Sequence, residues 1–131
     1  MASLVPNTGK AVLSGRMIGT TPTQAEPHFL GWGTGATAGS ATSTDLSTPA
    51  SEARVSGTST QVTTTVTNDT HQVLGTITAT GAKTITNVGV FDAAGSGSPP
   101  SGGVLYAIFD GLSQALSSGD SIQLTAKIQF T

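Results

Sequence analysis

Residues 121–130 alternate between polar and apolar side chains. The apolar positions are Ile122, Leu124, Ala126, Ile128 and Phe130, and the polar positions are Ser121, Gln123, Thr125, Lys127 and Gln129. Successive side chains of a strand point to opposite faces of a sheet, so this pattern predicts a strand with one buried and one solvated face. We expect this last strand to be central to the hydrophobic core.

Two further apolar runs precede this segment, at residues 85–91 and 104–109. Both end in a Phe-Asp dipeptide, and the segment between them is rich in Gly, Ser and Pro. Apolar runs bounded by such turn residues are typical of strands. We expect the two runs to form adjacent antiparallel strands.

The composition favours strands and turns over helices. Thr, Ser and Gly number 23, 15 and 17 of the 131 residues. Thr is enriched in strands, whereas Gly and Ser are enriched in turns. A single domain of this length is large enough to bury one core. The sequence therefore predicts an all-β fold, an antiparallel two-sheet β-sandwich of jelly-roll-like or Ig-like type.

The remaining strands are predicted from shorter patterns. We expect seven strands in total, and the four that have not yet been named cover residues 10–18, 28–32, 53–67 and 71–80. Asn68-Asp69 is a turn signal between two of them and predicts a hairpin. The third strand carries many hydroxyls, which suits a sheet edge. A short helical turn is expected between Asp110 and Asp120, and no helix of ordinary length.

The first nine residues are predicted to form an extended N-terminal arm, followed by a single β-sandwich domain over residues 10–131. Pro6 lacks an N–H, and Asn7-Thr8-Gly9 is a turn signal. Leu4 and Val5 give the arm two apolar side chains that a solvated tail would not need. Either the arm anchors the protein to a neighbouring subunit, or it is a disordered terminus.

Few residues in the sequence suit catalysis or metal binding. The two histidines, His28 and His71, lie in different predicted strands, and cysteine is absent. Most carboxylates lie in predicted turns, where Asp forms local hydrogen bonds. A calcium site shared by Asp92 and Asp110 is the strongest metal hypothesis, but we expect no metal, no cofactor and no enzymatic activity.

The charge and hydropathy of the chain argue against two classes of partner. Only five residues are basic and the formal net charge is −2, so we expect no electrostatic nucleic-acid site. No signal peptide pattern and no apolar run of about 20 residues is present, so we expect no membrane partner. Proteins with little net charge associate readily, so the surface suits either a packed assembly or a monomer made polar by Thr and Ser.

Two stretches resemble small virion structural proteins of tailed bacteriophages. The first runs from Phe29 to Val55 and resembles the family pattern at Gly31, Gly33, Thr34, Gly35, Leu46, Glu52 and Arg54. The second resembles the closing pattern of the family at Gly89, Val90, Phe91 and Asp92, at residues 105–109, and from Gly119-Asp120 to Phe130. Together they cover about 70 residues.

This resemblance implies a capsid decoration (cement) protein that binds the major capsid protein and copies of itself on the virion surface. A tail or fibre subunit, or a receptor- or glycan-binding module, is the alternative. The residues expected to contact the partner are Leu4, Val5, Trp32 and Thr34, although Trp32 also suits a core position.

Overall fold

Antiparallel strands make up most of the structure, a computed structural model that describes residues 2–19 and 24–131. The described residues form one helix and ten strands: β1 (Ala2–Leu4), α1 (Asn7–Arg16), β2 (Phe29–Gly33), β3 (Val55–Ser56), β4 (Thr58–Val62), β5 (Thr70–Thr78), β6 (Lys83–Ile85), β7 (Asn87–Phe91), β8 (Leu105–Asp110), β9 (Gln114–Leu116) and β10 (Ser121–Gln129). The predicted all-β class is confirmed at this level.

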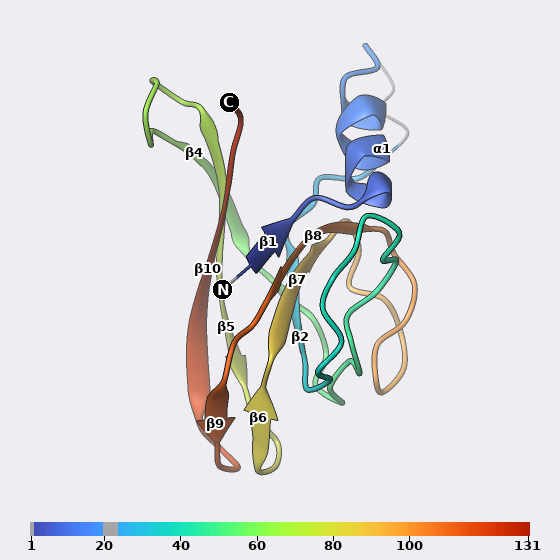
Figure 1. Cartoon of the computed structure of the whole chain (residues 1–131), viewed down its shortest axis with the longest axis vertical. Helices are drawn as coiled ribbons and strands as arrows, with labels where there is room; N and C mark the ends of the chain where they lie inside the picture. Colours follow the sequence, from blue (N-terminus) through green and yellow to red (C-terminus); the bar gives the residue numbers. More distant parts are fainter. Residues whose placement is uncertain (1, 20–23) are drawn as a thin grey trace.

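The strands form a five-stranded sheet in the order β1-β8-β7-β2-β3, a three-stranded sheet in the order β10-β5-β4, and the small pair β6-β9. Figure 1 shows the three-stranded sheet on the left, the five-stranded sheet beside it, and loops covering the far side of the larger sheet. The predicted hairpin around Asn68-Asp69 and the predicted antiparallel pairing of the two later apolar runs are both confirmed, because β4 pairs with β5 and β7 pairs with β8 in antiparallel register.

The main core lies between the two large sheets. Its buried members from the five-stranded sheet include Leu30, Trp32, Val88, Val90, Tyr106 and Ala107, and those from the three-stranded sheet are Val73, Ile77, Ala126 and Ile128. A second cluster, formed by Leu46, Phe91, Leu105 and Ile108, lies on the other face of the five-stranded sheet beneath the loops. The central strands of the larger sheet are therefore buried on both faces, and every residue of β7 is buried.

The predicted strand at residues 10–18 is wrong, because this segment belongs to α1. The buried positions of the helix are Gly9, Val12 and Gly15, which are spaced by three residues and so share one face. A Cβ on Gly9 would lie 2.0 Å from the Tyr106 carbonyl oxygen, so the missing side chain lets α1 pack directly on β8. The two glycines weaken the helical signal in the sequence, although tertiary packing favours the helix.

The predicted free arm is also absent from the described residues. Ala2–Leu4 forms β1, which pairs antiparallel with β8 of the same chain, Ala2 opposite Asp110 and Leu4 opposite Ile108. The Thr8 hydroxyl donates a hydrogen bond to the Leu105 carbonyl at 2.8 Å. Segment 2–9 is thus built into the fold through backbone pairing, which its short sequence does not encode.

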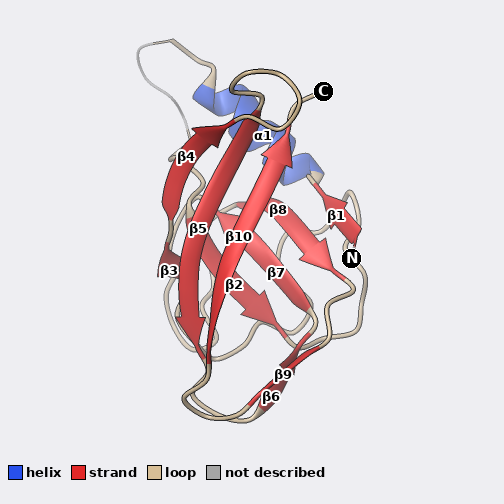
Figure 2. Cartoon of the chain, turned by 90° about the vertical axis from the view of Figure 1, so that its left-hand side faces the viewer, coloured by secondary structure: helices blue, strands red, loops and turns tan. Residues whose placement is uncertain are grey.

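Two details of the C-terminal segment correct the sequence predictions. β10 has the predicted alternation and contributes Ala126 and Ile128 to the core, but it is an edge strand of its sheet, and Phe130 beyond it is 49% exposed. The predicted helical turn before it is instead β9, which pairs with β6. Figure 2 shows β10 in front of the larger sheet, with β8 and β1 extending past it.

Candidate interaction surfaces

Two of the residues predicted to bind a partner are structural. Trp32 is 3% exposed and lies in the core, where its Nε1–H donates to Glu52 Oε2 at 3.0 Å. Thr34 is half-buried, and its backbone N–H donates to the Thr48 carbonyl at 3.0 Å. Both residues join the five-stranded sheet to the loop that covers it.

Glu52 is a buried carboxylate with several donors. Besides Trp32, it accepts hydrogen bonds from the backbone N–H and the hydroxyl of Thr80, both at 2.8 Å, and it forms an ion pair with Lys83. Burial alone would raise its pKa, but the hydrogen bonds from Lys83, Thr80 and Trp32 outweigh burial and lower the pKa to about 2. The carboxylate is therefore ionised at neutral pH and joins β2 to the β5–β6 connection.

Arg54 is a buried cation beside the second cluster, on the face of the five-stranded sheet opposite to Trp32. Its guanidinium lies 3.4 Å from the ring centroid of Phe91 and donates to the Gly102 and Ala93 carbonyls at 2.6 and 3.3 Å. Asp45 lies 3.6 Å away, near enough for an ion pair. Burial lowers the pKa of Arg54, and Asp45 and Asp92 counteract that effect. Arg54 thus joins the loop that contains Asp45 and the loop after β7 to the five-stranded sheet. Glu52 and Arg54, two residues of the sequence pattern described above, therefore both make structural contacts.

Leu4 and Val5, the other two predicted contact residues, line an open groove. This edge groove runs between β10 on one side and β1, β8 and the segment after β8 on the other. It consists of two adjoining cavities of about 320 and 530 Å³ that share Ser3, Phe109 and Lys127. The lining is mostly apolar, from Leu4, Val5, Val88, Phe109, Leu112 and Leu124. Sequence reasoning missed all of these except Leu4 and Val5, because the groove depends on which strand edges lie side by side.

The backbone of β10 borders this groove with unpaired groups. The Phe130 N–H donates to the Asp69 carbonyl at 2.9 Å, and the Ala79 N–H donates to the Asp120 carbonyl at 2.8 Å. Even-numbered residues of β10 therefore direct their backbone groups to β5. In an antiparallel ladder the direction alternates, so Thr125 and its odd-numbered neighbours direct N–H and C=O to the free edge.

A second surface, the hydroxyl face, covers the outer side of the three-stranded sheet. Its side chains are Thr58, Thr60, Gln72, Leu74, Thr76, Thr78, Ser121, Gln123, Thr125, Lys127 and Gln129. Hydrogen bonds between Thr78 and Ser121, at 2.6 Å, and between Gln72 and Thr60, at 3.5 Å, join neighbouring strands across this face. It carries one charged group, Lys127, and no aromatic ring.

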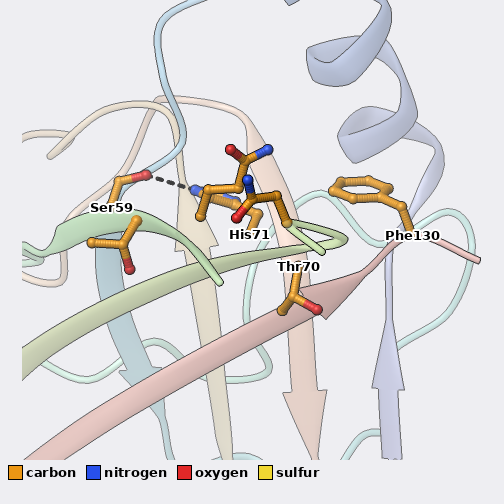
Figure 3. Close-up of a pocket in the computed structure, with 7 residues that line it drawn as sticks. Ser59, Thr70, His71 and Phe130 are labelled. Atoms are coloured by element: carbon orange, nitrogen blue, oxygen red, sulfur yellow. Dashed lines mark hydrogen bonds between the residues drawn. The ribbon is translucent and has the colours of Figure 1, made fainter. Parts of the chain in front are cut away.

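One cavity brings a serine and a histidine together. Figure 3 shows Ser59 Oγ and His71 Nε2, which are 2.7 Å apart, in a cavity of about 250 Å³ that Thr70 and Phe130 also line. Burial lowers the pKa of His71, an effect that Glu26 counteracts. A serine nucleophile also needs a group that orients the other ring nitrogen, and no described residue is hydrogen-bonded to His71 Nδ1. The geometry is that of a cross-strand pair between β4 and β5.

The two aspartates of the calcium hypothesis lie apart. Asp92 follows β7 and Asp110 ends β8, and antiparallel pairing sets these positions at opposite ends of the hairpin. Asp92 Oδ1 accepts from the Val104 N–H at 2.6 Å, and Asp110 Oδ2 accepts from the Gly39 N–H at 2.5 Å. Across residues 2–19 and 24–131, no three His, Cys, Asp or Glu side chains gather in a metal-binding arrangement.

In the part of the chain that the structure describes, no helix has the length and apolar character needed to span a membrane. Comparison of the chain with protein-family models, curated proteins and solved structures found no match.

Proposed function

We propose that this protein is a non-enzymatic structural protein of a tailed-bacteriophage virion, a capsid cement protein that binds the major capsid protein lattice and, on it, copies of itself. The observation that carries the proposal is the hydroxyl face. It extends over three strands and carries one charged side chain, and hydroxyls and amides form hydrogen bonds to a protein surface without the desolvation cost of ions. The family resemblance of residues 29–55 and 85–130 supplies the class of partner.

The proposed architecture is a two-sheet β-sandwich, with the five-stranded sheet as the rigid layer and the three-stranded sheet as the binding layer. The buried contacts of Glu52 and Arg54 support this division. They join loops to the larger sheet and lie away from the hydroxyl face, which is the proposed lattice contact. The absence of aromatic rings from the hydroxyl face favours a protein partner over a glycan, since sugar-binding surfaces present exposed rings.

A sedimentation assay tests the proposal. Expanded empty capsids, assembled from the major capsid protein encoded near this gene, are mixed with the protein at micromolar concentration and pelleted. We expect saturable binding with hundreds of copies per particle, weakened at least tenfold by Thr76→Glu, which introduces a charge at the centre of the hydroxyl face. The matched control is Thr84→Glu on β6, an exposed threonine outside that face.

Three outcomes would contradict the proposal. Capsids that pellet without the protein would exclude the cement role, and a few copies per complete particle would favour a tail or fibre subunit instead. Specific binding on a glycan array would favour the receptor-binding alternative.

A further inference from the structure

We propose that the edge groove is a docking site for one extended segment of a partner polypeptide, which adds a fourth strand to the three-stranded sheet along β10. This inference goes beyond the proposed function, because it concerns the free edge of the three-stranded sheet rather than its outer face, although Lys127 borders both, and it does not depend on the partner being a capsid protein. It rests on the free edge of β10, the uncovered apolar lining, the shape of the overhang and the charge of Lys127.

β10 is the longest free edge of the described sheets. It has nine residues, whereas the other edge strands of the two large sheets, β1, β3 and β4, have three, two and five, and β6 and β9 of the small pair have three each. Proteins protect edges with prolines, bulges, short strands or charged side chains, and of these devices β10 carries only Lys127. β10 contains no proline and pairs with β5 without a register shift, so an incoming strand would find a regular ladder.

The two sheets differ in width by two strands, and the overhang leaves apolar surface uncovered. Phe109 and Leu112 are only partly buried, and both line the groove beside β10. The groove extends along β10 from Gln123 to Gln129. Seven residues of strand span about 20 Å at roughly 3.3 Å per residue. A segment of this length would place alternate side chains over Phe109 and Leu112, and so complete the core layer.

A second copy of this chain does not fit the site through the same edge. A two-fold axis that paired β10 with its counterpart would set both five-stranded sheets in one layer. In Figure 2, β8 and β1 extend past β10 in that layer, so the β1 strands of the two copies would collide. A single strand fits beside β10 without displacing β1.

The charge of the groove indicates the chemistry of the segment. Lys127 is the only charged residue that lines either cavity, and no described carboxylate forms an ion pair with it. A residue of the added strand that lies opposite Lys127 would share its face, where opposite charges stabilise a cross-strand pair. The expected ligand is therefore an extended segment with apolar residues at alternate positions and an acidic residue between them.

Peptide binding tests the inference directly. The probe is the labelled peptide acetyl-Thr-Val-Glu-Val-Thr-Val-Thr-amide, titrated against the full-length protein and followed by fluorescence anisotropy. Thr125→Pro removes an N–H that points to the free edge, a position where a strand tolerates proline. We expect it to weaken binding at least tenfold, whereas the matched control Thr125→Ala, which keeps the N–H, changes binding less than about threefold.

A charge reversal at Lys127 provides a second variant, and it should keep the fold because this side chain is exposed. Lys127→Glu should weaken binding of the glutamate peptide several-fold and strengthen binding of the same peptide with lysine in place of glutamate. Amide exchange measured by NMR should show new protection at Thr125 and Lys127 when the peptide binds. No binding at millimolar peptide, equal binding to Thr125→Pro, or protein dimers that Thr125→Pro abolishes would each overturn the inference.

Discussion

The two large sheets of this protein differ in how many of their faces are buried. In the five-stranded sheet, β7 is buried on both faces, by the main core and by the cluster around Phe91. In the three-stranded sheet, β10 alternates between inward apolar and exposed polar residues, and its outer face meets solvent. One sheet is enclosed by its own loops, and the other presents both a face and an edge.

The comparison separates polar groups that stabilise the fold from polar groups that remain exposed for binding a partner. Glu52 and Arg54 are buried and satisfied by several partners around the larger sheet. The hydroxyls of the smaller sheet are exposed, and most have no partner beyond a neighbouring strand. We therefore expect the larger sheet to determine stability and the smaller sheet to determine binding.

The largest expected effect is on the enclosed side. Glu52→Ala removes one partner of a buried ion pair and leaves Lys83 and the Trp32 N–H without their acceptor, which should lower the free energy of unfolding by about 3–5 kcal/mol. Chemical denaturation measures this change. The control is Glu26→Ala, an exposed carboxylate, with an expected change below about 0.5 kcal/mol. Equal effects of the two variants would refute the division between the sheets.

Acidification should act through the same carboxylate. The pKa of Glu52 is about 2 in the folded chain against a usual 4.5, so its ionised form stabilises the fold above pH 4.5. That contribution, about 3 kcal/mol, is lost as the pH falls from 4.5 towards 2. Unfolding curves over this range should be steeper in pH for the native chain than for Glu52→Gln.

Asp69, in the turn between β4 and β5, is the carboxylate of the three-stranded sheet to compare with Glu52. The backbone N–H groups of Val66, Thr64 and Thr65 lower its pKa in the β4–β5 turn. Because this carboxylate is solvated, Asp69→Asn should leave most of the acid sensitivity in place. If Asp69→Asn removes that sensitivity and Glu52→Gln does not, the turn and not the enclosed sheet controls the acid response.

Equivalent aliphatic truncations should differ between the sheets. Leu30 of β2 is fully buried, whereas Ile128 lies on the edge strand and is 8% exposed. We expect Leu30→Ala to cost about 4 kcal/mol and Ile128→Ala about 2 kcal/mol, because the edge can relax around the smaller side chain. Thermal and urea unfolding of both variants test the difference, and a larger loss for Ile128→Ala would restore β10 to a central role.

The smallest effect on stability is expected on the hydroxyl face. Thr76→Glu and Thr60→Glu replace exposed side chains, so each should change the free energy of unfolding by less than about 0.5 kcal/mol. Their influence should be seen in capsid binding alone. A loss of stability comparable to that of Leu30→Ala would mean that this face has a structural role.

The sequence by itself determined the local features of this protein. The alternation over residues 121–130 gave the faces of β10 correctly, and turn signals located the β4–β5 and β7–β8 hairpins. These features follow from contacts between residues close in sequence, where side-chain direction and turn chemistry are set by the residues themselves. The abundance of Thr and the low charge likewise predicted a strand-rich fold with a polar, uncharged surface.

Only the tertiary structure decided the rest. Gly9, Val12 and Gly15 form a helix because β8 offers a surface that small residues can approach closely. Most partners of Glu52 and Arg54 lie 20 to 48 residues away, and β1 pairs with a strand about 100 residues later. The edge groove exists because one sheet is two strands wider than the other. Each of these depends on long-range pairing, which local periodicity does not encode.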